Sequence, residues 1–135
     1  MEDTTMKFGY TIIYVDDVPT SLKFFHDAFG FQTRFLHESN AYGELESGET
    51  TLAFASLDAA DLNLPDGITQ LKQLDKPAGI EIAFVTEDVR AAFEKSVSHG
   101  ATPIAEPTSK SWGQTVAYVR APNGVLIEIC SPMEP

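Results

Sequence analysis

The two halves of this chain carry the same order of predicted secondary structure, and this internal repeat restricts the fold more than any other feature. Residues 8–15 and 80–85 are short runs of β-branched, apolar and aromatic residues that predict strands. An aspartate able to cap a helix follows each run, Asp17 in the first half and Asp88 in the second. Apolar residues at helical spacing come next in both halves. Each half is therefore predicted to begin with a strand and a helix.

Further strands are predicted after each helix. Gly30 and Gly100 mark the helix ends, because glycine readily adopts the left-handed conformation of a C-cap. The halves close with strands at residues 50–56 and 125–130, each entered through a turn sequence. We predict two βαβββ modules, at about residues 7–57 and 79–132, joined by a linker at residues 58–78.

This module order predicts the fold class. One helix can cover only one face of a four-stranded sheet, so each module leaves its other face open. Two modules placed side by side would form a curved eight-stranded mixed sheet, with the helices on its outer face and a concave cleft within. We therefore predict a single α+β domain across residues 1–135, with a cleft suited to a small molecule.

Charge and cysteine usage limit the partners and the compartment. Twenty acidic residues against nine basic ones give a net charge of −11, which disfavours nucleic acid and anionic membranes and favours cationic or neutral ligands. No stretch approaches the apolar length of a transmembrane helix, and the N-terminal segment lacks the apolar core of a signal peptide. Cys130 is the single cysteine, which fits a reducing compartment. We expect a cytoplasmic protein that binds neither nucleic acid nor membrane.

Two aromatic–glycine pairs lie at similar places in the two halves. Tyr42-Gly43 precedes Trp112-Gly113, the only tryptophan, by seventy positions, and each pair is expected to open a strand. We therefore treat Tyr42 as the repeat mate of Trp112. Together with Tyr10 they are expected to place aromatic surface in or near the cleft.

Motifs at both ends of the chain resemble those of one large superfamily. The first comprises residues 15–18 (V-D-D-V) and 29–31 (F-G-F), and the second comprises residues 112–114 (W-G-Q) and 121–128 (A-P-N-G-V-L-I-E). The chain resembles the vicinal-oxygen-chelate superfamily of glyoxalases, bleomycin-resistance proteins and extradiol dioxygenases, and is closest in character to the bleomycin-resistance-like branch. The resemblance implies the paired βαβββ fold but no single chemistry, because the superfamily includes isomerases, lyases, dioxygenases and drug-binding proteins.

The resemblance also implies where a metal would bind. Metal-dependent members carry one ligand on the first strand and one on the last strand of each module. The matching positions here are Tyr10 and Ala53 in the first module and Glu81 and Glu128 in the second. Two glutamates and a phenol are few donors for a transition metal, which usually takes three or four protein ligands. A divalent metal on Glu81 and Glu128 is possible, but we favour no cofactor.

Strand alternation, independently of the resemblance, places Glu81 and Glu128 on the cleft side of their strands. There they could anchor a cation, act as a general base, or lie solvated at the rim, and the residues alone leave these alternatives open. The three histidines are expected on the surface, where they add no ligand to this pair. They are His26, His37 and His99.

The leading hypothesis is a protein that sequesters a small aromatic or cationic molecule in the cleft. The alternative is a glyoxalase-like lyase or isomerase, or a dioxygenase, that uses a divalent metal or a carboxylate base at Glu81 and Glu128. A degenerate domain with only a dimerisation or regulatory role is a third possibility. We expect a homodimer, because such domains commonly pair and residues 31–36 hold surplus apolar side chains. The residues expected to bind the ligand are Tyr10, Tyr42, Glu81, Trp112 and Glu128.

Overall fold

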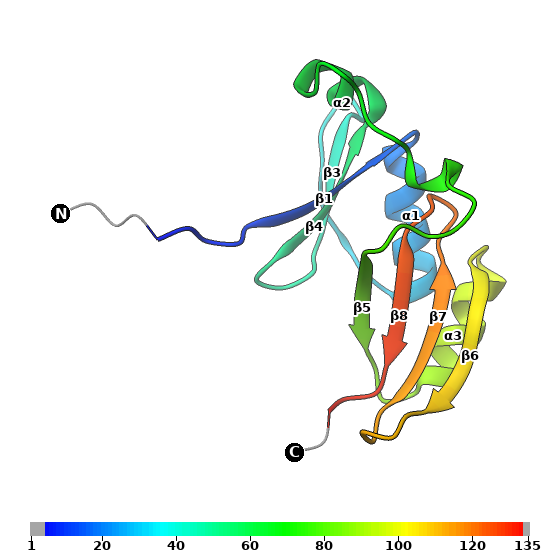
Figure 1. The fold of residues 1–135 in the computed structure, drawn as a ribbon. Coiled ribbons are helices and arrows are strands. Elements are labelled where there is room, and N and C mark those ends of the chain that lie inside the picture. The colour runs from blue at the N-terminus through cyan, green and yellow to red at the C-terminus, as the bar shows by residue number, and fades with distance from the viewer. Residues whose placement is uncertain (1–4, 134–135) are drawn as a thin grey trace.

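The computed structural model describes residues 5–133 and contains the two predicted βαβββ modules (Figure 1). The first module consists of β1 (Tyr10–Val15), α1 (Val18–Phe29), β2 (Thr33–Leu36), β3 (Tyr42–Leu45) and β4 (Thr51–Ser56). The linker contains α2 (Leu57–Asn63) and a short 3-10 helix, η1 (Leu71–Gln73). The second module consists of β5 (Glu81–Val85), α3 (Val89–Ser98), β6 (Thr102–Ser109), β7 (Thr115–Arg120) and β8 (Leu126–Cys130).

Both modules have the same strand order. The first sheet runs β1-β4-β3-β2 and the second runs β5-β8-β7-β6. In each sheet the first strand pairs in parallel with the last strand of the module, and the remaining pairs are antiparallel. The predicted α+β class and the repeated module are confirmed. The eight strands, however, form two four-stranded sheets and not one continuous sheet, since β1 and β5 are edge strands of different sheets.

Helix α1 joins the two sheets into one core. Its buried residues include Phe25, which is fully buried and lies 5.2 Å, centroid to centroid, from Phe54 of β4. Phe84 of β5 packs against the same helix, with its ring centroid 5.0 Å from that of Phe29 and 4.8 Å from that of Phe31. The two sheets therefore share one apolar core through α1, and the buried residues of both modules form a single cluster.

The predicted helix caps are confirmed. The Asp17 carboxylate accepts a hydrogen bond from the Thr20 backbone N–H at 3.0 Å, and Asp88 accepts one from Ala91 at 3.0 Å. Gly30 ends α1 with a φ of 82°, the left-handed conformation that glycine adopts without strain.

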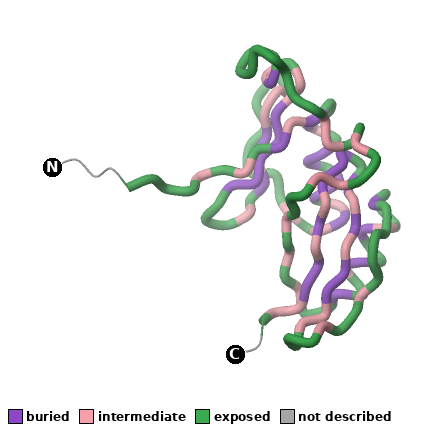
Figure 2. The backbone as a smooth tube through the Cα atoms, viewed as in Figure 1, coloured by how far each residue is buried: buried purple, intermediate pink, exposed green. Residues whose placement is uncertain are grey.

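The alternation of the edge strands leaves one face of each sheet uncovered. In β5, Phe84 packs inward while Glu81 and Val85 are exposed. In β1, Val15 is buried while Ile12 is 44% exposed. We call these uncovered surfaces the first and second open faces, after the first and second sheets. Because the covered sides meet at α1, the open faces are the sides of the sheets that lie away from the shared core (Figures 1 and 2).

The repeat has a different register from the one predicted for Tyr42 and Trp112. Tyr42 pairs with Ala55 of β4, whereas Val116 pairs with Cys130 at the equivalent place in the second sheet. Tyr42 thus corresponds to Val116, and Trp112 lies in the turn before β7. The reason is that β6 is twice as long as β2, which moves its connection to β7 beyond the body of the sheet.

The linker is fixed to the second module. The Arg120 guanidinium donates hydrogen bonds to the carbonyl oxygens of Leu71 at 2.7 Å and Leu74 at 2.9 Å. The turn between β7 and β8 contacts the same segment, and a Cβ atom on Gly124 would lie 2.2 Å from the Lys72 backbone nitrogen. Among the described residues, no helix is long and apolar enough to span a membrane.

The contact at Gly124 predicts a large cost for adding a methyl group. Gly124→Ala should lower the free energy of unfolding by about 2–4 kcal/mol, because φ is +95° and the linker backbone blocks the new Cβ. Gly48→Ala is the matched control, since Gly48 has a φ of +93° but no atom within 4 Å of the added Cβ, and it should cost about 1 kcal/mol. Equal losses for the two variants in urea denaturation would contradict the close packing of the linker.

Candidate functional site

Glu81 and Glu128 lie beside each other on the second open face. Strands β5 and β8 are adjacent and parallel, and Ala83 is paired with Glu128, so Glu81 lies two residues earlier on the same face. Desolvation, together with the hydrogen bond and the negative charge of Glu128, raises the pKa of the Glu81 carboxyl. The two glutamates therefore lie close together, as predicted. Binding of a proton or a cation would relieve the repulsion between their carboxylates.

Tyr118 extends this pair into a small polar cluster. It is paired with Glu128 across β7 and β8, and its hydroxyl donates a hydrogen bond to Glu128 Oε1 at 2.9 Å. That hydrogen bond and desolvation raise the pKa of Tyr118 to about 12, so the phenol stays protonated and remains a donor at neutral pH. Tyr118 is not among the predicted site residues, although alternation along β7 and its position opposite Glu128 could have indicated it.

Cys130 follows on the same face and is buried. Burial, followed by the hydrogen bond and charge of Glu128, raises the pKa of the Cys130 thiol. A thiol with a raised pKa is a poor nucleophile, because the reactive species is the thiolate. Cys130 is therefore a buried neighbour of the cluster of Glu81, Tyr118 and Glu128, and its thiol is less nucleophilic than that of an ordinary cysteine.

The first open face carries a different polar network. Tyr42 donates a hydrogen bond to Glu44 Oε2 at 2.7 Å, and Arg34 donates two to Glu44 Oε1, at 3.1 and 3.0 Å. Desolvation and the hydrogen bond to Glu44 raise the pKa of Tyr42. Both oxygens of the Glu44 carboxylate therefore have partners, with its charge compensated by Arg34.

The five predicted ligand-binding residues divide between separate parts of the structure. Glu81 and Glu128 lie on the second sheet, whereas Tyr10 and Tyr42 lie on the first. Trp112 is 58% exposed in the turn before β7, where its indole N–H donates to Gln114 Oε1 at 2.8 Å. One chain therefore does not bring all five residues into a single cleft, since packing on α1 separates the two open faces.

The strand register supports the predicted positional match of the four metal-ligand positions. Ile12 pairs with Ala53 in the first sheet as Ala83 pairs with Glu128 in the second, so Ala53 is the counterpart of Glu128. By the same register Tyr10 is the counterpart of Glu81. The donor set of this chain is therefore two carboxylates and one exposed phenol.

This donor set does not fit a transition metal. Zn²⁺, Fe²⁺ and similar ions are usually held by three or four side chains, with imidazole the commonest nitrogen ligand. Within residues 5–133, no group of three or more His, Cys, Asp or Glu side chains is placed to hold a metal ion. The histidines lie on α1, after β2 and at the end of α3, away from β5 and β8. We therefore derive no reaction step through a metal.

The match to known proteins agrees with this fold. The family model described as Glyoxalase/Bleomycin resistance protein/Dioxygenase superfamily matches residues 7–129. The chain belongs to this superfamily. No curated protein matches the chain. The resemblance inferred from the sequence motifs is thus confirmed at the level of the superfamily, which spans both binding proteins and enzymes.

Solved structures of the superfamily have the same fold at low identity. A glyoxalase-related enzyme from Fulvimarina pelagi is 18% identical, with 95% of this chain and 89% of that chain covered and a TM-score of 0.76. A family enzyme from Burkholderia phytofirmans PsJN is 21% identical, with 93% and 98% covered and a TM-score of 0.71. A protein of unknown function from Agrobacterium tumefaciens str. C58 is 21% identical, with 96% and 97% covered and a TM-score of 0.76. At these identities the likeness establishes the fold alone.

The raised pKa of Glu81 predicts a pH-dependent effect of its removal. Because the folded state favours the protonated carboxyl, the charged form costs stability at neutral pH, and that cost disappears as the pH falls through the folded pKa. Glu81→Gln should therefore raise the free energy of unfolding at pH 7.5, by at most about 1 kcal/mol for so exposed a group. The difference in the free energy of unfolding between Glu81→Gln and the wild type should decrease as the pH is lowered toward 4.5.

The same substitution in a Glu128→Gln background is the control. Without the neighbouring carboxyl, Glu81→Gln should lose the part of its stabilising effect that comes from Glu128 and keep the part that comes from desolvation, as measured in urea denaturation. An equal gain in both backgrounds would contradict an interaction between the two glutamates.

Proposed function

We propose that this superfamily member is a binding protein that holds a small planar cationic molecule against the second open face. The observation that carries the proposal is the cluster of Glu81, Tyr118 and Glu128, which lies on the same sheet face as the apolar residues Ala83 and Val85. Glu81 and Glu128 are adjacent carboxyls, and neither forms an ion pair with a side chain of residues 5–133, which favours a cation; the net charge of −11 attracts one from solution.

The cluster also orients the cation. The Tyr118 hydroxyl donates to Glu128 Oε1, and an ammonium or a protonated ring nitrogen would donate to Glu81 and Glu128 in place of the hydrogen bond between these two carboxyls. Val85, which is 64% exposed, and Ala83 supply apolar surface for the body of the ligand. A charged ring held in this way would gain both electrostatic and apolar contact.

We propose that a second copy of the chain supplies the opposite wall. Tyr10 is 58% exposed and Ile12 is 44% exposed on the first open face, next to the network of Tyr42, Glu44 and Arg34. A homodimer in which the first open face of one copy covers the second open face of the other would bury these side chains. It would also bring Tyr10 and Tyr42 of one copy opposite Glu81 and Glu128 of the other, and so unite residues that were expected from the sequence in the cleft of one chain.

A metal-free enzyme is the second candidate, and the raised pKa of Glu81 favours it. A carboxylate whose pKa is raised toward neutrality is a better general base than an ordinary one. Glu81 would then abstract a proton from a bound substrate, as a lyase or isomerase reaction requires, while Tyr118 would hold Glu128 in place. Glu81→Gln separates the two functions, because it would abolish turnover but only weaken the binding of a cation.

The binding proposal predicts a preference for charge at constant ligand shape. N-methylquinolinium should bind saturably, as measured by quenching of the Trp112 fluorescence or, if the ligand does not contact the indole, by calorimetry. Neutral quinoline should bind more weakly. Glu128→Gln should weaken N-methylquinolinium binding by about 1–3 kcal/mol, since Glu128 is half-buried. Glu81→Gln should cost less, because Glu81 is exposed.

Glu49→Gln is the control, because Glu49 is an exposed carboxylate in the turn between β3 and β4. It removes the same charge from the molecule and should leave binding unchanged. Equal binding of the charged and neutral compounds, or equal losses in the Glu49 and Glu128 variants, would contradict a specific cation site.

A further inference from the structure

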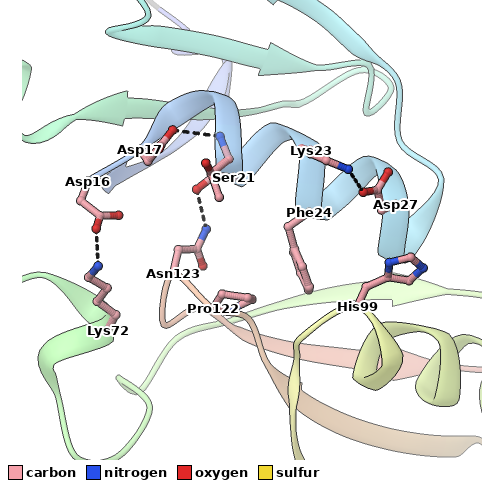
Figure 3. Close-up of a pocket in the computed structure, with 11 residues that line it drawn as sticks. Asp16, Asp17, Ser21, Lys23, Phe24, Asp27, Lys72, His99, Pro122 and Asn123 are labelled. Carbon is pink, nitrogen blue, oxygen red and sulfur yellow. Dashed lines mark hydrogen bonds and ion pairs between the residues drawn. The ribbon is translucent and has the colours of Figure 1, made fainter.

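A cavity of about 500 Å³ lies on the helix-covered side of the molecule, apart from both open faces (Figure 3). It is open to solvent and is lined by α1 and the two residues before it, by Lys72 of η1, by the turn between β7 and β8, and by His99 at the end of α3. Its volume falls within the range of pockets that hold small molecules. None of the residues that line it belongs to the cluster of Glu81, Tyr118 and Glu128.

The inner wall of this cavity is fixed by buried contacts between the modules. Phe24 is 7% exposed and lies beside Pro122, which together provide an apolar surface. Behind them Asn123 donates a hydrogen bond to Ser21 Oγ at 3.2 Å and accepts one from the Val125 backbone N–H. Both Asn123 and Ser21 are buried, so the wall is formed before any ligand binds.

The rim carries charges of both signs. Asp16, which precedes α1, forms an ion pair with Lys72 of η1, and Lys23 forms one with Asp27 one turn along α1 (Figure 3). The Lys72 hydrogen bond lowers the pKa of Asp16 and the Lys23 hydrogen bond lowers that of Asp27, so both carboxylates are charged at neutral pH. The pair of Asp16 and Lys72 joins segments 56 positions apart and spans the gap between α1 and η1.

An ion pair of this kind opens at little cost. Its side chains are 39% and 46% exposed, and exposed pairs contribute about 1 kcal/mol or less. A molecule that carries an ammonium and a carboxylate on neighbouring atoms would replace one ion pair with two. An anion alone would leave Asp16 without a partner, and a cation alone would leave Lys72 without one.

We propose that this cavity binds a small zwitterion with an apolar ring, of which a free aromatic amino acid is the simplest example. The ring lies on Phe24 and Pro122, the ammonium faces Asp16, and the carboxylate faces Lys72. The site is independent of the proposed cation site on the second open face. Because its walls come from α1, the linker and the second module, the ligand also holds these three segments together.

The test compares three compounds that share one ring. L-phenylalanine carries both charges, phenethylamine only the ammonium, and 3-phenylpropanoate only the carboxylate. In amide NMR titrations, L-phenylalanine should bind more tightly than either analogue, by up to about fivefold, as expected for one additional exposed ion pair. The shifted amides should lie at residues 16–24, 71–73 and 122–124. A stronger response to either analogue, or shifts centred on β5 and β8, would overturn the proposal.

A variant in the linker separates binding from packing. Lys72→Met keeps the aliphatic contact but removes the charge. It should reduce the affinity for L-phenylalanine to the level of phenethylamine, and it should not weaken the binding of phenethylamine itself. Lys76→Met is the control, because Lys76 is an exposed linker lysine outside the cavity. If Lys72→Met weakens all three compounds equally, or if L-phenylalanine does not saturate below ~10 mM, the cavity is not a zwitterion site.

Discussion

The contact of α1 with an aromatic side chain from each sheet is the interaction on which the rest of the structure depends. Phe25 on this helix contacts Phe54 of the first sheet and, edge to face at 6.2 Å, Phe84 of the second. The first sheet is covered by α1 and the second by α3, and the two helices pack against each other. The edge strands β1 and β5 belong to separate sheets, and the open faces are the sides of the sheets away from the shared core. The positions of the polar clusters follow from this arrangement, and it is the basis of the proposal that a second copy covers each open face.

The two open faces have the same backbone but different chemistry. At equivalent register positions the second face has Glu81 and Glu128 where the first has Tyr10 and Ala53. The carboxylate that the first face does carry, Glu44, is bound by Arg34 and Tyr42, so it is not free to take a ligand. Uncompensated negative charge is thus concentrated on the second face, which supports the assignment of the cation site there.

Much of the fold could be predicted because local patterns determine it. Asp17 and Asp88 cap their helices as expected, and alternation correctly placed Glu81 and Glu128 on one face. The division into two sheets could not be predicted, since an apolar residue such as Phe84 has the same pattern whichever helix it packs on. The predicted correspondence of Tyr42 and Trp112 was wrong because the length of β6 cannot be predicted from a pattern of apolar residues. A contact between paired strands, such as that of Arg34 with Glu44, can be predicted only when the register of β2 and β3 is known.

The central claim is that the open faces are functional surfaces that a second copy covers. Sedimentation equilibrium at micromolar concentration tests this claim most directly. Ile12→Arg places a charge on the first open face, and Leu62→Arg on α2 is the control, because Leu62 is 88% exposed. We predict a mass of about twice 14.8 kDa for the wild type and Leu62→Arg, and a monomer for Ile12→Arg. A wild-type monomer, or a dimer that Ile12→Arg leaves intact, would contradict the account.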